Sequence, residues 1–368
     1  MSNKPTALLA AGGTGGHLFP ALALAEELLK DGWEVIIATD ERGARYDKSD
    51  LNYQTVVISS GTLKPGLLGK FKAVAALGKG ITQSFGIMRK YKPDVVVGFG
   101  GYPCFPPLFA AQILKEPTLL HEANAVLGKA NKMLAAKANN IALSLPKTKG
   151  VTDHKKFKEK AVVTGNPIRS AVVAKQSAPY PTLDAQGEFK IFIMGGSQGA
   201  RIFSDVIPAA VKLLAKADQQ RLHIVQQCRE EDMERTQKAY TDMGVKCTLK
   251  PFFHDAPQQL ADCHLFIGRS GASTVADVAV VGRPAIFVPL KHADHQQKLN
   301  ADVVADMGGA WVLEGDDFNA KELAKHLVKL MAEPDTLKKA AKNAASAGQP
   351  QAARNLANIV KRLGKGTP

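Results

Sequence analysis

The chain has 368 residues, of which 45% are hydrophobic, 22% charged and 6% aromatic, and its formal net charge at pH 7 is +14. This length favours two domains of roughly 150 to 200 residues, and this composition excludes a disordered or fibrous protein. No apolar run approaches the roughly 20 residues that span a bilayer, and the first ten residues lack the layout of a signal peptide. The four cysteines form no CxxC pair, so we expect reduced thiols and a cytoplasmic location.

Short β-branched runs alternate with helical patterns, which is typical of a parallel sheet covered by helices on both faces. The expected strands of a first series are 7–10, 35–39, 56–58, 95–98, 118–121 and 141–143. After a stretch rich in Pro, Gly and Ser, a second series comprises 190–194, 223–226, 247–250, 265–268, 285–289 and 310–313. We therefore expect an α/β protein with two Rossmann-like domains, residues 1–168 and 169–348. A basic amphipathic helix in about 349–368 is expected to pack back on the first domain.

The first expected strand leads into the glycine-rich stretch "AAGGTGGHLFP". A dinucleotide-binding loop has the pattern GxGxxG, but Leu18 stands where the third glycine would be, while Asp40 stands near the place of the ribose-binding acid. The glycines among residues 12–16 still allow backbone N–H groups to approach an anion at a helix start. A phosphate-like ligand is favoured, and a merely tight turn is the alternative.

His17 begins the expected helix at the edge of the sheet where such folds bind ligands. A lone histidine is more often structural, but here the glycine loop, the helix start and the imidazole coincide. His17 is therefore a candidate to donate to a diphosphate or to act as a base near neutral pH.

The segment 52–93 has no acidic residue and mixes lysines and arginines with large apolar side chains. Such a surface suits an anionic membrane face, and a solvated helix with a buried apolar face is the alternative. The expected membrane residues are Lys64, Leu67, Leu68, Lys70, Phe71, Lys72 and Lys79. Nucleic acid is disfavoured, because the chain shows no recognised binding motif and few aromatic residues for stacking.

Two further motifs of the first half follow expected strands, namely "GFGGYP" at 98–103 and "HEAN" at 121–124. The second begins like the zinc-protease motif HExxH, but Ala125 removes its second histidine. Glu122 and Asn124 then remain as a carboxylate and an amide that suit a sugar hydroxyl. A turn held by local hydrogen bonds is the alternative.

The second half opens with a similar loop, "GGSQGAR" at 195–201. Ser197 is a plausible helix N-cap, which alone would explain its presence. The duplication of a glycine loop favours diphosphate binding, with Arg169 from "GNPIR" as a charged partner.

The run 268–301 places polar residues at two expected helix starts near one crevice. Asp277 can accept two hydrogen bonds from ribose, and the amides of Gln296, Gln297 and Asn300 suit sugar hydroxyls. A capping box formed by Asp294 and Gln297 is the alternative. His292, Asp294 and His295 resemble a metal cluster on paper, but nothing else supports one, and we expect no protein-bound metal.

Two further motifs, "SGASTVAD" and "HADHQQKLNA", lie in the second half of the chain. Together with the motifs above they span nearly the whole chain, and in their order they resemble the motifs of the MurG family of glycosyltransferases. The resemblance implies a GT-B fold that binds the lipid acceptor mainly in the first domain and UDP-N-acetylglucosamine mainly in the second. It also implies an inverting transfer of N-acetylglucosamine to the 4-hydroxyl of N-acetylmuramic acid in lipid I, which makes lipid II for peptidoglycan at the cytoplasmic face of the inner membrane. No cofactor is expected.

The resemblance also assigns residues. The implied donor contacts are Thr14, Gly15, Gly16, Asn124, Arg169, Ser197, Phe253, Ala272, Ser273, Thr274, Val275, Ala276, Asp277 and Gln297, with Gln296 and Asn300 as further candidates. The expected acceptor contacts are Gly13, His17, Gly100, Gly101 and Tyr102. Two positions depart from the family: Asp277 stands where Glu is usual, and Phe253 aligns with a backbone contact to uracil.

The acceptor hydroxyl needs a base, and the catalytic candidates are His17 and Glu122. His17 is preferred for its position, although it is also suited to hold the acceptor diphosphate. Two rival functions stay open from the residues alone. A nicotinamide-dependent oxidoreductase rests on the partial fingerprint with Asp40, and a non-catalytic membrane scaffold rests on the basic segment 52–93.

Overall fold

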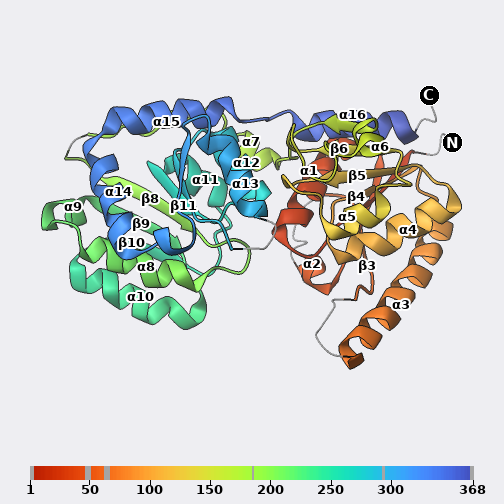
Figure 1. Cartoon of the computed structure of the whole chain (residues 1–368), viewed down its shortest axis with the longest axis horizontal. Coiled ribbons are helices and arrows are strands. Elements are labelled where there is room, and N and C mark those ends of the chain that lie inside the picture. Colours follow the sequence, from red (N-terminus) through yellow and green to blue (C-terminus); the bar gives the residue numbers. More distant parts are fainter. Residues whose placement is uncertain (1–3, 46–50, 62–66, 185, 292–294, 365–368) are drawn as a thin grey trace. The chain divides into compact units, whose positions relative to one another are not determined.

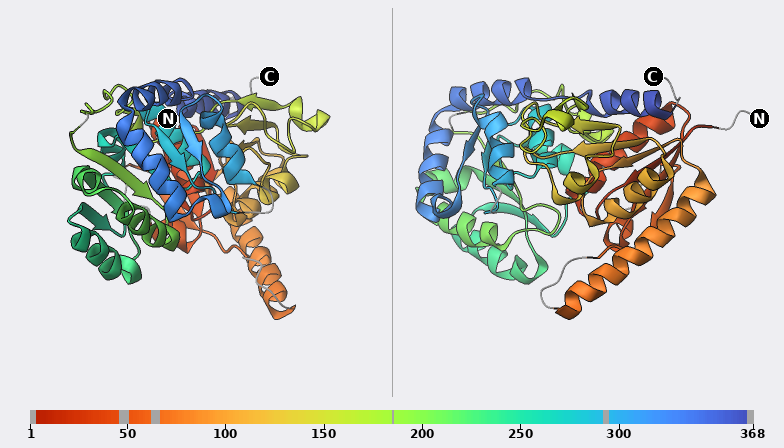
Figure 2. Two further views of the ribbon diagram at one scale, coloured as in Figure 1. Left: turned by 60° about the vertical axis from the view of Figure 1, so that its left-hand side comes forward. Right: turned by 45° about the vertical axis from the view of Figure 1, so that its right-hand side comes forward.

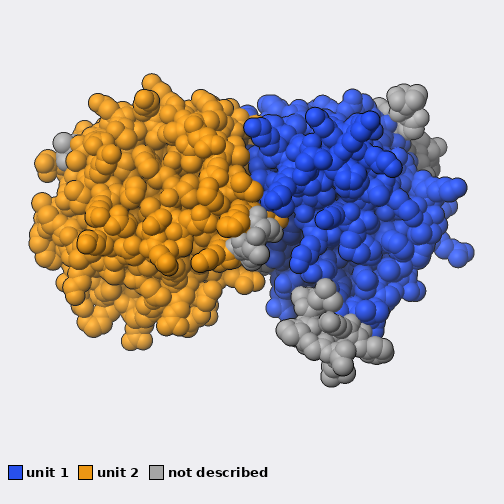
Figure 3. Space-filling view, viewed as in Figure 1, with its two compact units in different colours: residues 1–170, 350–368 blue, residues 171–349 orange. Residues whose placement is uncertain are grey.

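The computed structural model describes residues 4–45, 51–61, 67–184, 186–291 and 295–364, without the side chains of 67–72. Its contacts divide the chain into two compact units, residues 1–170 with 350–368 (unit 1) and residues 171–349 (unit 2) (Figure 3). Each unit is built around one parallel sheet, so the predicted α/β class is confirmed.

The sheet of unit 1 has the order β3-β2-β1-β4-β5-β6-β7, and every neighbouring pair is parallel. Its strands are β1 (Thr6–Ala10), β2 (Glu34–Thr39), β3 (Gln54–Val57), β4 (Val95–Gly98), β5 (Thr118–Glu122), β6 (Asn140–Leu143) and β7 (Ala161–Val163). The helical elements are α1 (Gly15–Lys30), α2 (Glu41–Arg45), α3 (Leu67–Tyr91), η1 (Tyr102–Cys104), α4 (Phe105–Leu114), α5 (Lys129–Leu134), α6 (Lys155–Lys158), α7 (Ser170–Val173), which enters unit 2, and α16 (Ala352–Gly364).

The core of unit 1 lies on both faces of this sheet, because successive strand residues point to opposite sides. Leu9 belongs to a cluster with residues of α1 and α16, whereas Leu8 belongs to a cluster with residues of α4. Helix α16 comes from the end of the chain and packs against α1 (Figure 1). Asp31, at the end of α1, forms ion pairs with Arg354 and Lys361 of α16.

The sheet of unit 2 has the order β10-β9-β8-β11-β12-β13, again with every pair parallel. Its strands are β8 (Phe189–Met194), β9 (Leu222–Gln227), β10 (Lys246–Lys250), β11 (Leu265–Gly268), β12 (Ala285–Phe287) and β13 (Ala310–Val312). The helical elements are α8 (Arg201–Lys212), α9 (Lys216–Arg221), α10 (Glu230–Met243), α11 (Ala256–Asp262), α12 (Ala272–Val281), α13 (Gln296–Ala305), η2 (Gly315–Asp317), α14 (Ala320–Ala332) and α15 (Pro334–Ser346).

Both sheets have the doubly wound arrangement, in which the first strand of the unit lies between strands reached in opposite directions. In unit 1 the direction reverses between β1 and β4, and in unit 2 between β8 and β11. Ligands of such sheets bind beyond the carboxyl ends of the strands at this switch point. The glycine loops predicted from the sequence follow β1, β4 and β8, and the predicted polar run 268–301 starts at the end of β11.

Helix α3 is the longest helix described, and it extends out from the body of unit 1 in both views of Figure 2. The chain contains no helix among the described residues with the length and hydropathy needed to cross a membrane.

Candidate active site

The opening glycine loop connects β1 to α1, and close packing requires glycine at positions 12 and 13. A Cβ at Gly13 would collide with the carboxylate of Asp40, and one at Gly12 would lie 3.3 Å from the Cα of Gly101. The N–H of Gly12 donates to the carbonyl of Gly100 (3.1 Å). The first loop and the loop after β4 therefore pack backbone against backbone, where a side chain would not fit.

The loop after β4 needs glycine for a second reason. Gly100 and Gly101 have φ values of +87° and +77°, which side chains rarely adopt. A Cβ at Gly100 would lie 3.1 Å from the ring of His17. Unit 1 thus brings together the predicted acceptor residues Gly13, His17, Gly100 and Gly101, and half-exposed Tyr102 begins η1 next to them.

His17 lies in the first turn of α1, half-buried. Its Nδ1 hydrogen-bonds the backbone oxygen of Phe99 (2.8 Å), and because a carbonyl can only accept, Nδ1 carries the hydrogen. The neutral ring therefore has its lone pair on Nε2. Burial lowers the pKa of His17 from its ordinary value, against the opposing effects of the Glu122 charge and the Phe99 carbonyl.

Glu122 ends β5, is buried, and accepts hydrogen bonds with both oxygens. Its Oε1 accepts from the backbone and side-chain N–H groups of Asn124 (3.1 and 3.2 Å), and its Oε2 accepts from Gly128 N (2.9 Å) and Asn131 Nδ2 (2.9 Å). The carboxylate thereby holds the loop from 123 to the start of α5. The turn held by local hydrogen bonds, considered from the sequence as an alternative, is present.

Beneath this loop, buried polar groups meet at the ends of β5 and β6. The Nε2 of His121 lies 3.2 Å from Ser144 Oγ, and Asn131 Nδ2 also donates to the backbone oxygen of His121 (3.0 Å). Within the described part of the chain, His121 Nδ1, Asn131 Oδ1 and Asn166 Nδ2 are buried without a hydrogen-bond partner. Burial lowers the pKa of His121 to about 4, so this imidazole is neutral at physiological pH.

Arg169 is a further predicted donor residue of unit 1. Its guanidinium lies 4.1 Å from the centre of the Phe19 ring, a cation–π contact with a residue of α1. Phe19 in turn packs on the start of α1, because a Cβ at Gly15 would lie 2.9 Å from its ring. Arg169 is therefore held beside the helix start that follows the opening glycine loop.

In unit 2 the loop from Gly195 to Ala200 connects β8 to α8. The prediction of Ser197 as N-cap is wrong, because α8 begins at Arg201 with Ala200 at the N-cap and no side-chain cap. Positive φ values at Gly196 (+91°) and Gly199 (+67°) let the backbone turn again before the helix starts. Ser197 consequently lies within the loop.

The backbone of this second loop leaves donors for a ligand. The N–H groups of Gly196, Ser197 and Gln198 donate to no acceptor among the described residues. Unpaired N–H groups before a helix start favour an anion, since they add to the positive end of the helix dipole.

The predicted donor residues 272–277 form the first turns of α12, after β11, and Val275 is the buried member of this half-buried stretch. Asn300 of α13 is buried and its Nδ2 donates to the backbone oxygen of Ser270 (3.3 Å), which joins the starts of α12 and α13. Gln297 accepts from Leu290 N (2.9 Å). The capping-box alternative is wrong, because the N-cap of α13 is His295.

The remaining predicted residues are placed as follows. Phe253 is buried and packs edge to face with Phe192, so its backbone is the part available for a ligand. Gln296 is the first residue of α13 and half-buried. Lys79 is exposed on α3; Lys64, His292 and Asp294 lie outside the described residues, as do the side chains of Leu67, Leu68, Lys70, Phe71 and Lys72.

Comparison with known proteins agrees with this geometry. Residues 7–143 match the glycosyltransferase family 28 N-terminal domain, and residues 190–356 match the glycosyltransferase family 28 C-terminal domain. A protein of Rhodospirillum centenum named UDP-N-acetylglucosamine–N-acetylmuramyl-(pentapeptide) pyrophosphoryl-undecaprenol N-acetylglucosamine transferase is 47% identical over 98% of this chain and 94% of its own. A Brucella abortus protein of the same name is 44% identical, covering 100% of this chain and 96% of its own.

A solved structure gives the same result. The crystal structure of Acinetobacter baumannii MurG superposes with a TM-score of 0.76 at 31% identity, covering 98% of this chain and 100% of that one. The chain belongs to the MurG family, within glycosyltransferase family 28. The protein is therefore a glycosyltransferase, and the GT-B class predicted from the motifs is confirmed.

In this member of the MurG family, some residues that hold the site loops in place were not predicted from the sequence. Asn131 and Gln227 each bond a predicted site loop, and Arg269 donates to the carbonyls of Val288 and Pro289. None lies in a quoted glycine motif. Gln227 could have been found from the sequence, because it is a polar residue that directly follows the buried core of β9.

Proposed function

We propose that the protein transfers N-acetylglucosamine from UDP-N-acetylglucosamine to the 4-hydroxyl of N-acetylmuramic acid in lipid I, forming lipid II for peptidoglycan synthesis. The observation that carries this assignment is the name shared by relatives that are 44–47% identical over nearly the full chain. The two glycine loops support it, because both substrates contain a diphosphate and each loop lies at the switch point of its sheet.

In the reaction, the acceptor oxygen forms a bond to the anomeric carbon while the bond from that carbon to UDP breaks on the opposite face. Negative charge builds on the departing β-phosphate and the sugar becomes oxocarbenium-like. N–H groups of the 195–200 loop, with Arg169, are suited to stabilise that charge. Losing one such preorganised donor typically costs about 3 kcal/mol of transition-state stabilisation.

The acceptor hydroxyl loses its proton in this step, and His17 is the base that the local chemistry favours. Its Nε2 has a lone pair, since Nδ1 donates to Phe99. Glu122 is the weaker candidate, because four N–H donors already occupy its carboxylate. Glu122 is then a positioning residue that shapes the loop carrying Asn124.

The transfer needs no protein-bound metal in this proposal, because N–H groups and a guanidinium take over charge stabilisation. Addition of EDTA should leave the rate unchanged. A rate that falls with EDTA and returns with added Mg²⁺ would contradict this part.

The acceptor is a lipid, so we place the protein at the cytoplasmic face of the inner membrane as a peripheral protein. The basic segment that includes α3 is the proposed contact with anionic lipid. Binding to anionic vesicles should weaken when Lys64, Lys70, Lys72 and Lys79 become Glu. The matched control changes four exposed lysines of unit 2, Lys321, Lys329, Lys339 and Lys342, to Glu. An equal loss of vesicle binding in the two variants would show that the basic segment is not the membrane contact.

The deciding experiment mixes purified protein with labelled UDP-N-acetylglucosamine and a lipid I analogue. Label should move to the analogue, and its absence there would overturn the assignment. The nicotinamide rival loses its main support, because Asp40 already accepts from Arg42 and from Gly43 N at the start of α2. UDP should raise the melting temperature and NAD should not; a pure membrane scaffold would respond to neither.

A further inference from the structure

The glycine loop of unit 2 is held at both ends by the segment that ends β9. At its first end, Gly195 N donates to Oε1 of buried Gln227 (3.0 Å). At its last end, Gly199 O accepts from Nη2 of Arg229 (3.3 Å). Three consecutive residues, 227–229, therefore carry both contacts to the loop.

Each of these side chains is itself oriented. The amide of Gln227 donates through Nε2 to the carbonyl of Pro251 (3.3 Å), which directs its oxygen to Gly195. Arg229 occupies the N-cap of α10, and its Nη1 lies 3.7 Å from Glu231 Oε1. A Cβ at Gly199 would lie 3.2 Å from Arg229 Cγ, so the aliphatic part of Arg229 also packs against the loop.

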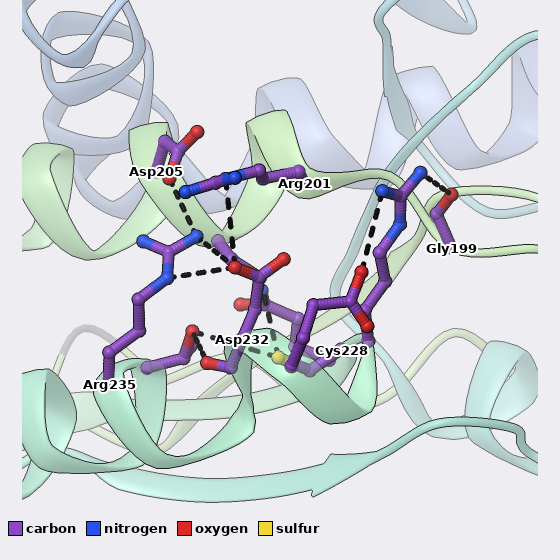
Figure 4. A network of polar contacts seen from close by, with 11 residues as sticks. Gly199, Arg201, Asp205, Cys228, Asp232 and Arg235 are labelled. Carbon is purple, nitrogen blue, oxygen red and sulfur yellow. Dashed lines mark hydrogen bonds and ion pairs between the residues drawn. The ribbon is translucent and has the colours of Figure 1, made fainter.

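A neighbouring network of ion pairs joins α8, which follows the loop, to α10, which follows β9. Asp232 of α10 is buried, accepts from Arg235 (2.9 and 2.6 Å) and lies 3.7 Å from Nε of Arg201, the first residue of α8. Figure 4 shows Asp232 between Arg201 and Arg235, with Arg235 also reaching Asp205 of α8. The start of α8, and hence the end of the loop, is thereby tied to α10.

Between its two held ends, the loop exposes the N–H groups of Gly196, Ser197 and Gln198, which donate to no acceptor among the described residues. A loop with several backbone donors binds an anion well only if its conformation is set before binding, because ordering it during binding would cost free energy. Holding both ends of a six-residue loop is a direct way to set that conformation.

We propose that Arg229, together with Gln227, is a positioning residue for the donor diphosphate. These side chains hold the 195–200 loop in the conformation whose N–H groups meet the phosphates. The inference rests on the proposed function, since it takes the anion to be the diphosphate of UDP-N-acetylglucosamine.

The test compares Arg229→Met with wild type in binding of UDP and of uridine, measured by calorimetry. Methionine keeps the aliphatic packing against Gly199 and removes the donor. UDP affinity should fall about tenfold, the equivalent of one hydrogen bond to the loop, while uridine affinity stays constant. The KM for UDP-N-acetylglucosamine should rise more than kcat falls, and Arg229→Lys should recover part of the loss.

The matched control is Arg221→Met, at the opposite end of β9. Arg221, like Arg229, donates to backbone carbonyls, in its case those of Gly187 and Asp184, but at the amino-terminal edge of the sheet. Its UDP affinity should equal that of wild type. As an independent variant, Gln227→Leu should weaken UDP and spare uridine in the same way.

The outcomes are distinguishable. Wild-type protein that binds no UDP overturns the proposed function. Wild-type protein that binds UDP, with Arg229→Met binding it equally well, overturns only the positioning role. Equal loss of UDP and uridine in Arg229→Met also overturns it, because the residue would then support unit 2 in general.

Discussion

The imidazole Nδ1 of His17 donates to the backbone oxygen of Phe99 across 2.8 Å, joining the first turn of α1 to the residue after β4. These two elements follow the strands between which the sheet of unit 1 changes direction. The orientation of the ring is thus determined by the switch point itself. This contact also decides which nitrogen can accept a proton.

The first prediction concerns the pH dependence of the transfer. Because burial lowers the pKa of His17, its Nε2 stays unprotonated as the pH falls below the ordinary value near 6.5. The acidic limb of kcat/KM should therefore lie below pH 6.5. His17→Ala should reduce kcat by about 10² to 10⁴, the usual contribution of a general base. An acidic limb above pH 6.5 would show that a group other than His17 causes the limb.

The second prediction separates His17 from Glu122. The Glu122 charge raises the pKa of His17, so Glu122→Gln should move the acidic limb to lower pH while leaving it visible. The rate should also fall, because the NH2 group of the new glutamine would replace one carboxylate oxygen and leave an N–H donor of the loop without its acceptor. If Glu122 were the base, the variant would lose the limb together with nearly all activity. Rate measurements from pH 4.5 to 8 distinguish the two cases.

The third prediction concerns stability. Burial lowers the pKa of His121 to about 4, so the unfolded chain binds a proton at this residue below pH 6.5 and the folded chain does not. Stability should be complete above pH 6.5 and should decline as the pH falls towards 4, by about 3 kcal/mol at pH 4 from this residue. Denaturant unfolding of His121→Gln should depend less steeply on pH. An unchanged pH slope would show that other groups account for the decline.

The fold was predictable where one strand and one glycine loop followed each other in the sequence. All twelve expected strands are present, with each end within two residues of its predicted position. The strand β7 was missed, because Ala161–Val163 is only three residues long and merges into the polar stretch after it. Short edge strands have too little periodic pattern to be recognised.

The site was predictable only in part. Glycine motifs mark the loops because close packing or a positive φ excludes other residues, as Gly13 beside Asp40 and Gly196 with a φ of +91° illustrate. The residues that hold those loops have no such signature. Gln227 and Arg229 lie about 30 residues after the loop they contact, and only the pairing of β8 with β9 brings them there. Ser197 was misassigned as a cap because the sequence does not show where α8 starts.

The fourth prediction concerns Asp277, on the second turn of α12. If its carboxylate accepts from the donor ribose, Asp277→Ala should raise the KM for UDP-N-acetylglucosamine about tenfold and the acceptor KM much less, as expected for a lost charged hydrogen bond. Steady-state kinetics with each substrate varied in turn provide the measurement. Equal increases for both substrates would argue against ribose recognition.

The fifth prediction concerns the contact of Arg169 with Phe19. The guanidinium lies 4.1 Å from the ring centre, and such a contact is worth about 0.5–1 kcal/mol at partly exposed sites. If Arg169 binds the donor diphosphate, Phe19→Leu should raise the donor KM about threefold, because leucine keeps the packing against Gly15 and loses the aromatic face. Phe19→Tyr keeps that face and should behave like wild type. A donor KM that is unchanged in Phe19→Leu, or raised equally in Phe19→Tyr, would mean that the ring does not position Arg169.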